Sequence, residues 1–183
     1  MDKTAIFIDG GYLSKALATS FDRATIDFSK LSEEIADHMP ILRTYYYNCM
    51  PYKSASPTVS ENDRFQKMQR FINSLERLDR YEVRLGKLEY RGRRENGDPI
   101  FQQKRVDILL GCDLVLLSAK QKIAKAVLLT GDSDFIPAIE VAKNEGVEIS
   151  LYYCKDNLPH DSLMLIADER NELTADLIDR IRL

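Results

Sequence analysis

The chain has 183 residues, of which 44% are hydrophobic and 30% are charged, and its formal net charge at pH 7 is −3. This balance is typical of a globular domain with a sizeable core. The small negative charge excludes attraction of nucleic acid by the protein as a whole, so any basic surface has to be local.

The first half of the chain alternates between strand and helix patterns. Thr4–Ile8 is a short continuous apolar run, typical of a strand buried on both faces, and Asp9 with two following glycines ends it. The spacing of apolar residues then predicts a short helix around Leu13–Leu17, a helix over Phe28–Met39, a strand over Ile41–Tyr47, a loop over Pro51–Ser60, a long helix over Phe65–Leu78, a strand over Tyr81–Tyr90 and a hairpin or loop over Arg91–Pro99.

The second half continues the alternation. Arg105–Lys120 is apolar nearly all round, which predicts a central buried helix. Further on, the patterns predict a strand over Ala126–Thr130, a helix over Phe135–Lys143, a strand over Val147–Tyr153, and closing helices over Ser162–Ala167 and Leu173–Ile181. We therefore expect an α/β fold: a single three-layer domain over residues 1–183, with a central, mainly parallel sheet flanked by helices. The apolar C-terminal helices could support a homodimer.

The remaining composition bears on location and cofactors. No apolar run approaches the ~18 residues that span a membrane, and Thr4–Ile8 is too short for a signal peptide, so we expect a cytoplasmic protein without a membrane partner. Two histidines are too few for a His₃ zinc site. Cys49, Cys112 and Cys154 form no C-x-x-C pair, and Cys112 and Cys154 lie in apolar runs, so we expect reduced core thiols.

Four aspartates lie beside apolar runs: Asp9, Asp107, Asp132 and Asp134. Each is explained locally as an Asx turn or a helix N-terminus. The carboxyl ends of parallel strands meet at one edge of a sheet, however, so these carboxylates are expected to converge. Carboxylates ~4 Å apart would repel by about 4 kcal/mol at an effective dielectric of ~20. A divalent ion would offset that repulsion, and oxygen ligands favour Mg²⁺ or Mn²⁺.

Two further residues have open assignments. Asp113 follows Asp107 by six positions, which is about 240° of rotation on a helix, so it either ligates the ion or pairs with a basic or hydroxyl group in the core. Ser133 either orients a ligand or caps the following helix.

A local basic surface is predicted between Arg80 and Arg105, where eight basic and four acidic residues give a net charge of +4. We expect Lys104 and Arg105, which precede Asp107, to contact phosphate, together with Arg91, Arg93 and Arg94. Three interleaved aromatic residues, Tyr81, Tyr90 and Phe101, could stack bases. The alternative is a solvated charged hairpin without a ligand.

Three motifs together carry a family resemblance. Ala5–Leu13, Lys104–Asp107 with Asp113, and Leu128–Phe135 resemble the NYN domain family, in its LabA-like branch, within the PIN-like nuclease superfamily. Tyr12 stands where that family often has Asn. The resemblance implies a compact α/β domain with a parallel sheet and an acidic Mg²⁺ or Mn²⁺ site that cleaves RNA. It matches Asp9, Asp107, Asp132 and Asp134 to the family's acidic positions.

The sequence thus predicts a metal-dependent ribonuclease that hydrolyses the phosphodiester bonds of single-stranded or loop RNA at this aspartate site. The alternative is an RNA-binding or regulatory NYN module with weak or no catalysis. A phosphatase of the haloacid dehalogenase type ranks lower, because its chemistry needs an acid two positions after Asp9, where this chain has Gly11.

Overall fold

The computed structural model describes residues 2–97 and 99–183. Within these residues, the strands are β1 (Thr4–Asp9), β2 (Ile41–Cys49), β3 (Tyr81–Arg93), β4 (Pro99–Lys104), β5 (Lys125–Leu129), β6 (Glu148–Tyr153) and β7 (Glu169–Glu172). The helices are α1 (Gly10–Ser20), α2 (Phe28–Ile35), α3 (Val59–Leu75), α4 (Val106–Ala119), α5 (Ile136–Asn144), α6 (Asp161–Ile166) and α7 (Ala175–Ile181), with a short 3₁₀ turn, η1, at Ser133–Phe135.

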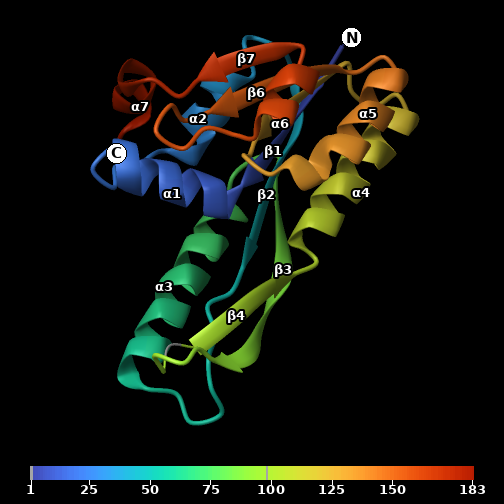
Figure 1. Ribbon diagram of the computed structural model, residues 1–183. Coiled ribbons are helices and arrows are strands. Elements are labelled where there is room, and N and C mark those ends of the chain that lie inside the picture. Colours follow the sequence, from blue (N-terminus) through green and yellow to red (C-terminus); the bar gives the residue numbers. More distant parts are fainter. Residues whose placement is uncertain (1, 98) are drawn as a thin grey trace.

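One sheet organises the chain, with the strand order β4-β3-β2-β1-β5-β6-β7 (Figure 1). Every neighbouring pair is parallel except β3 and β4, which form an antiparallel hairpin. The predicted α/β fold with a mainly parallel central sheet is confirmed. β1 lies at the centre, between β2 and β5, so the residues that follow β1 and β5 emerge side by side.

Two apolar cores lie on the two faces of the sheet. Phe7 and Leu128 face a core shared with α4, α5 and α6, whereas Ile6 and Val127 face a core shared with α1, α2, α3 and α7. In Figure 1, α4 and α5 lie on one side of the strands, and α1 and α7 lie on the other. The whole run from Thr4 to Ile8 is fully buried, as expected for a central strand covered on both faces.

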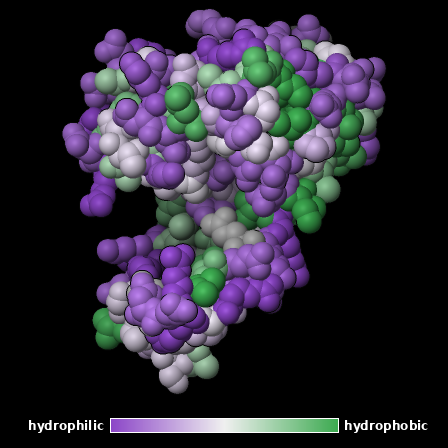
Figure 2. Space-filling view, viewed as in Figure 1, coloured by the Kyte–Doolittle hydropathy of each residue, from purple (hydrophilic) through white to green (hydrophobic). Residues whose placement is uncertain are grey.

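A projecting arm departs from the compact body. Pairing between β2 and β3 ends at Cys49 and Gly86, and residues 87–97 and 99–104 then continue as the β3–β4 hairpin. We call this hairpin, with residues 51–71 beside it, the arm. It extends away from β5, β6 and β7 (Figure 1), and in the space-filling view it is a mostly hydrophilic lobe beyond a hollowed waist (Figure 2). Helix α3 buries only Ile72 and Leu75, near its body end.

Some local predictions were wrong, for identifiable reasons. β4 and β7 were not predicted because they are short, largely polar strands at the two edges of the sheet, without a buried apolar face. Helix α4 is not fully buried: it covers one face of the sheet and leaves Ile108 70% and Leu116 50% exposed. Cys112 lies on α4 and is exposed, so the prediction of a core thiol fails there, whereas Cys49 and Cys154 are buried.

The predicted homodimer stays a prediction, because no second copy is present. Leu177, Ile178 and Ile181 of α7 are buried in the chain's own core, so these apolar residues of the C-terminal helix do not offer a surface to another copy. Along the described part of the chain, none of the helices combines the length and apolar character needed to cross a bilayer.

Candidate acidic site at the carboxyl edge of the sheet

Asp9 ends β1 and caps α1. Its Oδ1 accepts hydrogen bonds from the backbone N–H groups of Gly11 (2.9 Å) and Tyr12 (3.1 Å). The following helix packs against β2 so closely that a Cβ on Gly10 would lie 2.3 Å from the Tyr46 hydroxyl and 2.6 Å from Asn48 Nδ2. Glycine at position 10 is therefore required for α1 to start directly at the strand end and to hold Asp9 in place.

The segment after β5 meets Asp9 through Thr130. The buried hydroxyl of Thr130 donates to Asp9 Oδ2 (3.2 Å) and accepts from the backbone N–H of Asp132 (3.3 Å). Asp132 in turn accepts a hydrogen bond on Oδ1 from the N–H of Asp134 (2.9 Å), which caps the η1 turn. Sequence reasoning missed the bridging role of Thr130, although a hydroxyl directly before Gly-Asp at a strand end is a usable signal.

Tyr12 also fixes this region, in a way the sequence did not predict. Its backbone N–H bonds Asp9, while its hydroxyl donates to the Asn157 carbonyl (2.8 Å) and accepts from the Cys154 N–H (3.0 Å). A Cβ on Gly131 would lie 2.6 Å from the Tyr12 ring. The tyrosine thus packs the start of α1 against the ends of β5 and β6, and its side chain does not stand in for an amide beside the carboxylates.

Asp107 comes to the same region from a third segment. The β3–β4 hairpin returns the chain to the body, where Arg105 adopts a positive φ of 76° and α4 begins. A Cβ on Gly86 would lie 2.5 Å from both the Lys104 carbonyl oxygen and Val106 Cγ2, so this return is closely packed. Asp107 lies exposed in the first turn of α4.

Electrostatics links the four carboxylates. Burial raises the pKa of Asp9 above its usual value against the lowering effect of its hydrogen bonds, and the charge of Asp132 raises it further. The pKa of Asp107 is also raised, first by partial burial and then by the charges of Asp132, Asp9 and Asp134. The three segments therefore bring all four predicted acidic residues into one electrostatic neighbourhood, where they repel one another.

This group fits a hard divalent ion in its chemistry but is not a closed cage. Among residues 2–97 and 99–183, no three His, Cys, Asp or Glu side chains are grouped closely enough to hold a metal ion. Mg²⁺ generally keeps several waters and takes only one or two protein carboxylates together with substrate phosphates, so an open group of oxygen donors suits it. Within the group, the Thr130 hydroxyl joins the carboxylate of Asp9 to the backbone N–H of Asp132.

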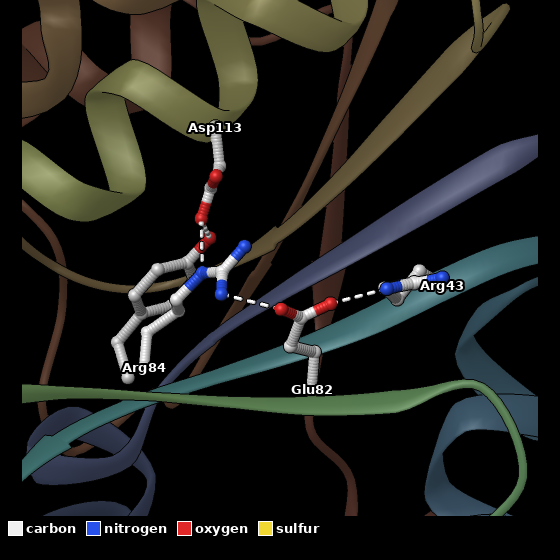
Figure 3. Close-up of polar contacts among 5 residues, drawn as sticks. Arg43, Glu82, Arg84 and Asp113 are labelled. Carbon is white, nitrogen blue, oxygen red and sulfur yellow. Dashed lines mark hydrogen bonds and ion pairs between the residues drawn. The ribbon is translucent and has the colours of Figure 1, made fainter.

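Asp113 does not belong to this group. Its Oδ2 accepts hydrogen bonds from the Tyr47 hydroxyl (2.9 Å) and from Arg84 Nε (3.1 Å). Figure 3 shows that these polar contacts continue along a row of side chains: Arg84 also pairs with Glu82, and Glu82 pairs with Arg43. Asp113 is absent from the charges that raise the pKa of Asp9 or Asp107. Of the two assignments left open, the structure shows pairing with a basic and a hydroxyl group.

The predicted phosphate-binding residues lie at the two ends of the β3–β4 hairpin. Lys104 lies opposite Lys87 at the body end of the hairpin, and its ammonium pairs with Glu89 (3.1 Å). Arg105 follows it and is exposed. Arg91, Arg93 and Arg94 lie near the far end of the hairpin and are exposed.

Part of this basic surface is bound internally. Glu89 is approached by Lys87 (3.6 Å), Arg91 (3.0 Å) and Lys104 (3.1 Å), so one acid offsets one of three cations. Arg93 donates to the Gly97 carbonyl (2.8 Å). Ser133 is half-buried at the start of η1, where it follows Asp132.

Comparisons with known proteins agree with this architecture. The chain resembles, over 100% of its length and 96% of the other chain, the crystal structure of a protein of unknown function, VPA0982 from Vibrio parahaemolyticus, with a TM-score of 0.62 and 17% identity, which shows the fold alone. It is 35% identical over 74 residues to the uncharacterized protein y4oD of Sinorhizobium fredii, a match that covers 40% of this chain and only 30% of that protein. The NYN domain model matches residues 3–172, and the chain therefore belongs to the NYN domain family, a nuclease-like group.

Proposed function

We propose that this protein is a metal-dependent ribonuclease that hydrolyses RNA phosphodiester bonds at the acidic site. The observation that carries the proposal is the convergence of Asp9, Asp107, Asp132 and Asp134 from three separate segments, where burial first and mutual repulsion second raise the pKa of Asp9 and Asp107. A soluble fold gains nothing from such repulsion, so a cation-dependent role explains it better than helix capping alone.

The residues take distinct roles in this proposal. Asp9, Asp132 and Asp107 would hold Mg²⁺ or Mn²⁺, and Asp134 would ligate or orient the attacking water. Such an ion would act as a Lewis acid on the phosphate and lower the pKa of water. Backbone N–H groups of Gly11 and Tyr12 fix the Asp9 carboxylate, and Thr130 keeps it in register with Asp132, so these two acids are held before any ligand arrives.

The proposed substrate is RNA that is single-stranded or looped, since an exposed acidic rim reaches an unpaired strand more easily than a duplex. Lys104 and Arg105, directly before Asp107, would hold the phosphate beside the site. The motif pattern also leads us to propose the LabA-like branch of the family, and the three free cysteines lead us to propose a cytoplasmic location.

A second function, RNA binding with little or no cleavage, is favoured by one observation. Within the described residues no three potential ligands are grouped tightly enough to hold an ion, so affinity for metal could be too low for turnover. The two functions share the fold and the basic hairpin, and they differ only in whether the four carboxylates act on the phosphate.

Cleavage of an end-labelled unstructured RNA by purified protein separates them, with single-stranded DNA of the same sequence alongside. We expect cleavage in Mg²⁺ or Mn²⁺, none in EDTA, and at least a ~100-fold loss in Asp132→Asn, equivalent to about 2.7 kcal/mol of transition-state stabilisation. Asp27→Asn is the matched control, because Asp27 caps α2 as Asp132 caps η1, and it lies outside the acidic group. Cleavage that persists unchanged in Asp132→Asn would reveal a contaminant and contradict the proposal.

A further inference from the structure

Three aromatic rings on the arm pack together without being buried. Tyr90 and Phe101 are directly opposite each other in the β3–β4 hairpin, with ring centroids 6.0 Å apart. Tyr52, from the loop after β2, lies 5.9 Å from Tyr90 and 5.1 Å from Phe101. Tyr90 remains 45% and Phe101 39% exposed, so the cluster leaves substantial aromatic surface open to solvent.

A pocket of about 620 Å³ opens onto these rings, and its lining includes the side chains of Arg64 on α3 and Arg93 on β3. Its size is in the range of sites that bind small organic groups, ~300–1,000 Å³. Glu61 also lines it, but that carboxylate is engaged by the Ser54 hydroxyl (2.9 Å) and the Thr58 N–H (2.8 Å) in a capping box.

The charge at this pocket is available to a ligand. Across the described residues, Arg64 has no carboxylate within ion-pair distance, and its Nε makes only a long hydrogen bond to the Ser60 carbonyl (3.4 Å). Lys53 adds a further cation nearby, 5.2 Å from the centre of the Phe65 ring. Open aromatic faces next to a guanidinium group without a carboxylate partner, here that of Arg64, are the combination that binds bases by stacking and phosphates by charge.

One of the three residues predicted for stacking is not part of this cluster. Tyr81 lies at the body end of β3, where its pKa is raised by burial and its hydroxyl hydrogen bonds with the Phe28 carbonyl and the Ser32 hydroxyl. The third ring of the cluster is instead that of Tyr52, which comes from another segment and could not be found from the hairpin sequence alone.

The pocket lies well away from the acidic site. Asp9 at the end of β1 pairs with Tyr47 of β2, and Tyr47 pairs with Arg84 of β3. Tyr90 is six residues further along β3, so it lies about 20 Å beyond Asp9 in the strand direction at ~3.3 Å per residue.

We propose that the pocket formed by Tyr52, Tyr90 and Phe101 is a distal binding subsite that stacks one or two unpaired RNA bases, with Arg64 and Arg93 on the adjoining phosphates. The inference rests on the proposed function for its substrate class. In this proposal the arm binds one part of the RNA, and the RNA strand then runs back along the hairpin, past Lys104, to the four carboxylates. The subsite recognises unpaired bases of any sequence, because every base offers a face for stacking.

The test measures binding separately from cleavage. An Asp132→Asn background in EDTA is titrated against fluorescein-labelled oligouridylate of about twelve nucleotides, a length within the site sizes typical of single-strand binding, and against the same oligomer with abasic positions. Circular dichroism checks that each variant is folded. Tyr90→Ala and Phe101→Ala should each weaken binding about tenfold, the order expected for one lost stack. Tyr90→Phe should match the background, because it keeps the ring.

Two variants serve as matched comparisons. Ile100→Ala, which removes an exposed apolar side chain next to Phe101 but outside the pocket lining, should leave the affinity unchanged. Arg64→Gln should weaken binding and reduce the slope of log K against log salt by about 0.7, the value for one contact to single-stranded phosphate.

The results separate this inference from the proposed function. Equal affinity of Tyr90→Ala and Tyr90→Phe, or an equal effect of Tyr90→Ala on intact and abasic RNA, would overturn the stacking subsite even if the wild type cleaves RNA. Ring-dependent binding by a protein that never cleaves RNA would support the subsite and reject the nuclease.

Discussion

Removing one charge from the acidic group should relieve a destabilising repulsion while it abolishes the proposed activity. In Asp9→Asn, the amide oxygen can still accept from the N–H groups of Gly11 and Tyr12, because Asn and Asp are equally good N-caps. What is lost is the charge itself. Burial and the charge of Asp132 raise the pKa of Asp9, so at pH 7 the ionised carboxylate is less favourable in the folded chain than in the unfolded chain.

The magnitude follows from Coulomb's law. Two unit charges ~8 Å apart at an effective dielectric of ~20 repel by about 2 kcal/mol, and exposure and salt reduce this to about 1 kcal/mol. The neutral variant also loses an attraction to the helix N-terminus of ~0.3–1 kcal/mol. The matched control Asp27→Asn loses that attraction at α2 from a cap with the same distances, 2.9 and 3.1 Å, without any relief of the repulsion around Asp9. Asp9→Asn should therefore be more stable than Asp27→Asn by about 1 kcal/mol.

Urea unfolding at pH 7 in EDTA measures this difference. It should shrink as the pH falls through the raised pKa of Asp9, because protonation removes the same charge from the parent chain. Adding Mg²⁺ should stabilise the parent and Asp27→Asn more than Asp9→Asn, since an ion bound only by the folded state adds RT ln(1 + [L]/Kd). If Asp9→Asn is destabilised in EDTA as much as Asp27→Asn, the inferred repulsion does not exist.

Two further predictions concern carboxylates outside the acidic group. Asp113→Asn should lower the free energy of unfolding by about 2 kcal/mol, because it loses the charged hydrogen bond with Arg84. Thermal unfolding should show that Mg²⁺ stabilises this variant as much as the parent. A smaller stabilisation by Mg²⁺ in the variant would instead make Asp113 a ligand. Although burial acts in the opposite direction, Lys143 and the Ile149 N–H lower the pKa of Asp168, so its contribution is present above the ordinary aspartate pKa of ~3.9 and is lost as the pH falls through the lowered value. Asp168→Asn should therefore cost less than ~1 kcal/mol at pH 7, given its exposure, and the cost should shrink as the pH falls below the ordinary aspartate pKa of ~3.9; a deficit that stays constant in unfolding experiments as the pH falls through this range would disprove the assignment.

Much of the fold could be predicted because it depends on local chemistry. The continuous apolar runs before Asp9 and Gly131 predicted central strands, and every residue of Thr4–Ile8 and Ala126–Thr130 is buried. The helices with a clear apolar face were found, although α3 begins at Val59 and not at the predicted Phe65, and α2 ends at Ile35 and not at Met39. The predictions failed where the pattern is ambiguous: a helix that is apolar all round does not reveal its solvent side, so Cys112 was placed in the core.

The sequence by itself located the four candidate aspartates and showed that Asp9, Asp132 and Asp134 follow the central strands, because the carboxyl ends of parallel strands meet at one edge of a sheet. Only the tertiary structure decided which acid is excluded, since Asp113 meets Arg84 and Tyr47 through packing between segments about 30 and 66 positions away in the chain. The bridging Thr130 and the aromatic pocket completed by Tyr52 likewise depend on contacts across more than one element. A one-dimensional pattern records how far apart residues lie along the chain, whereas the partners of a buried charge or an open ring are set by distances that exist only after the elements have packed.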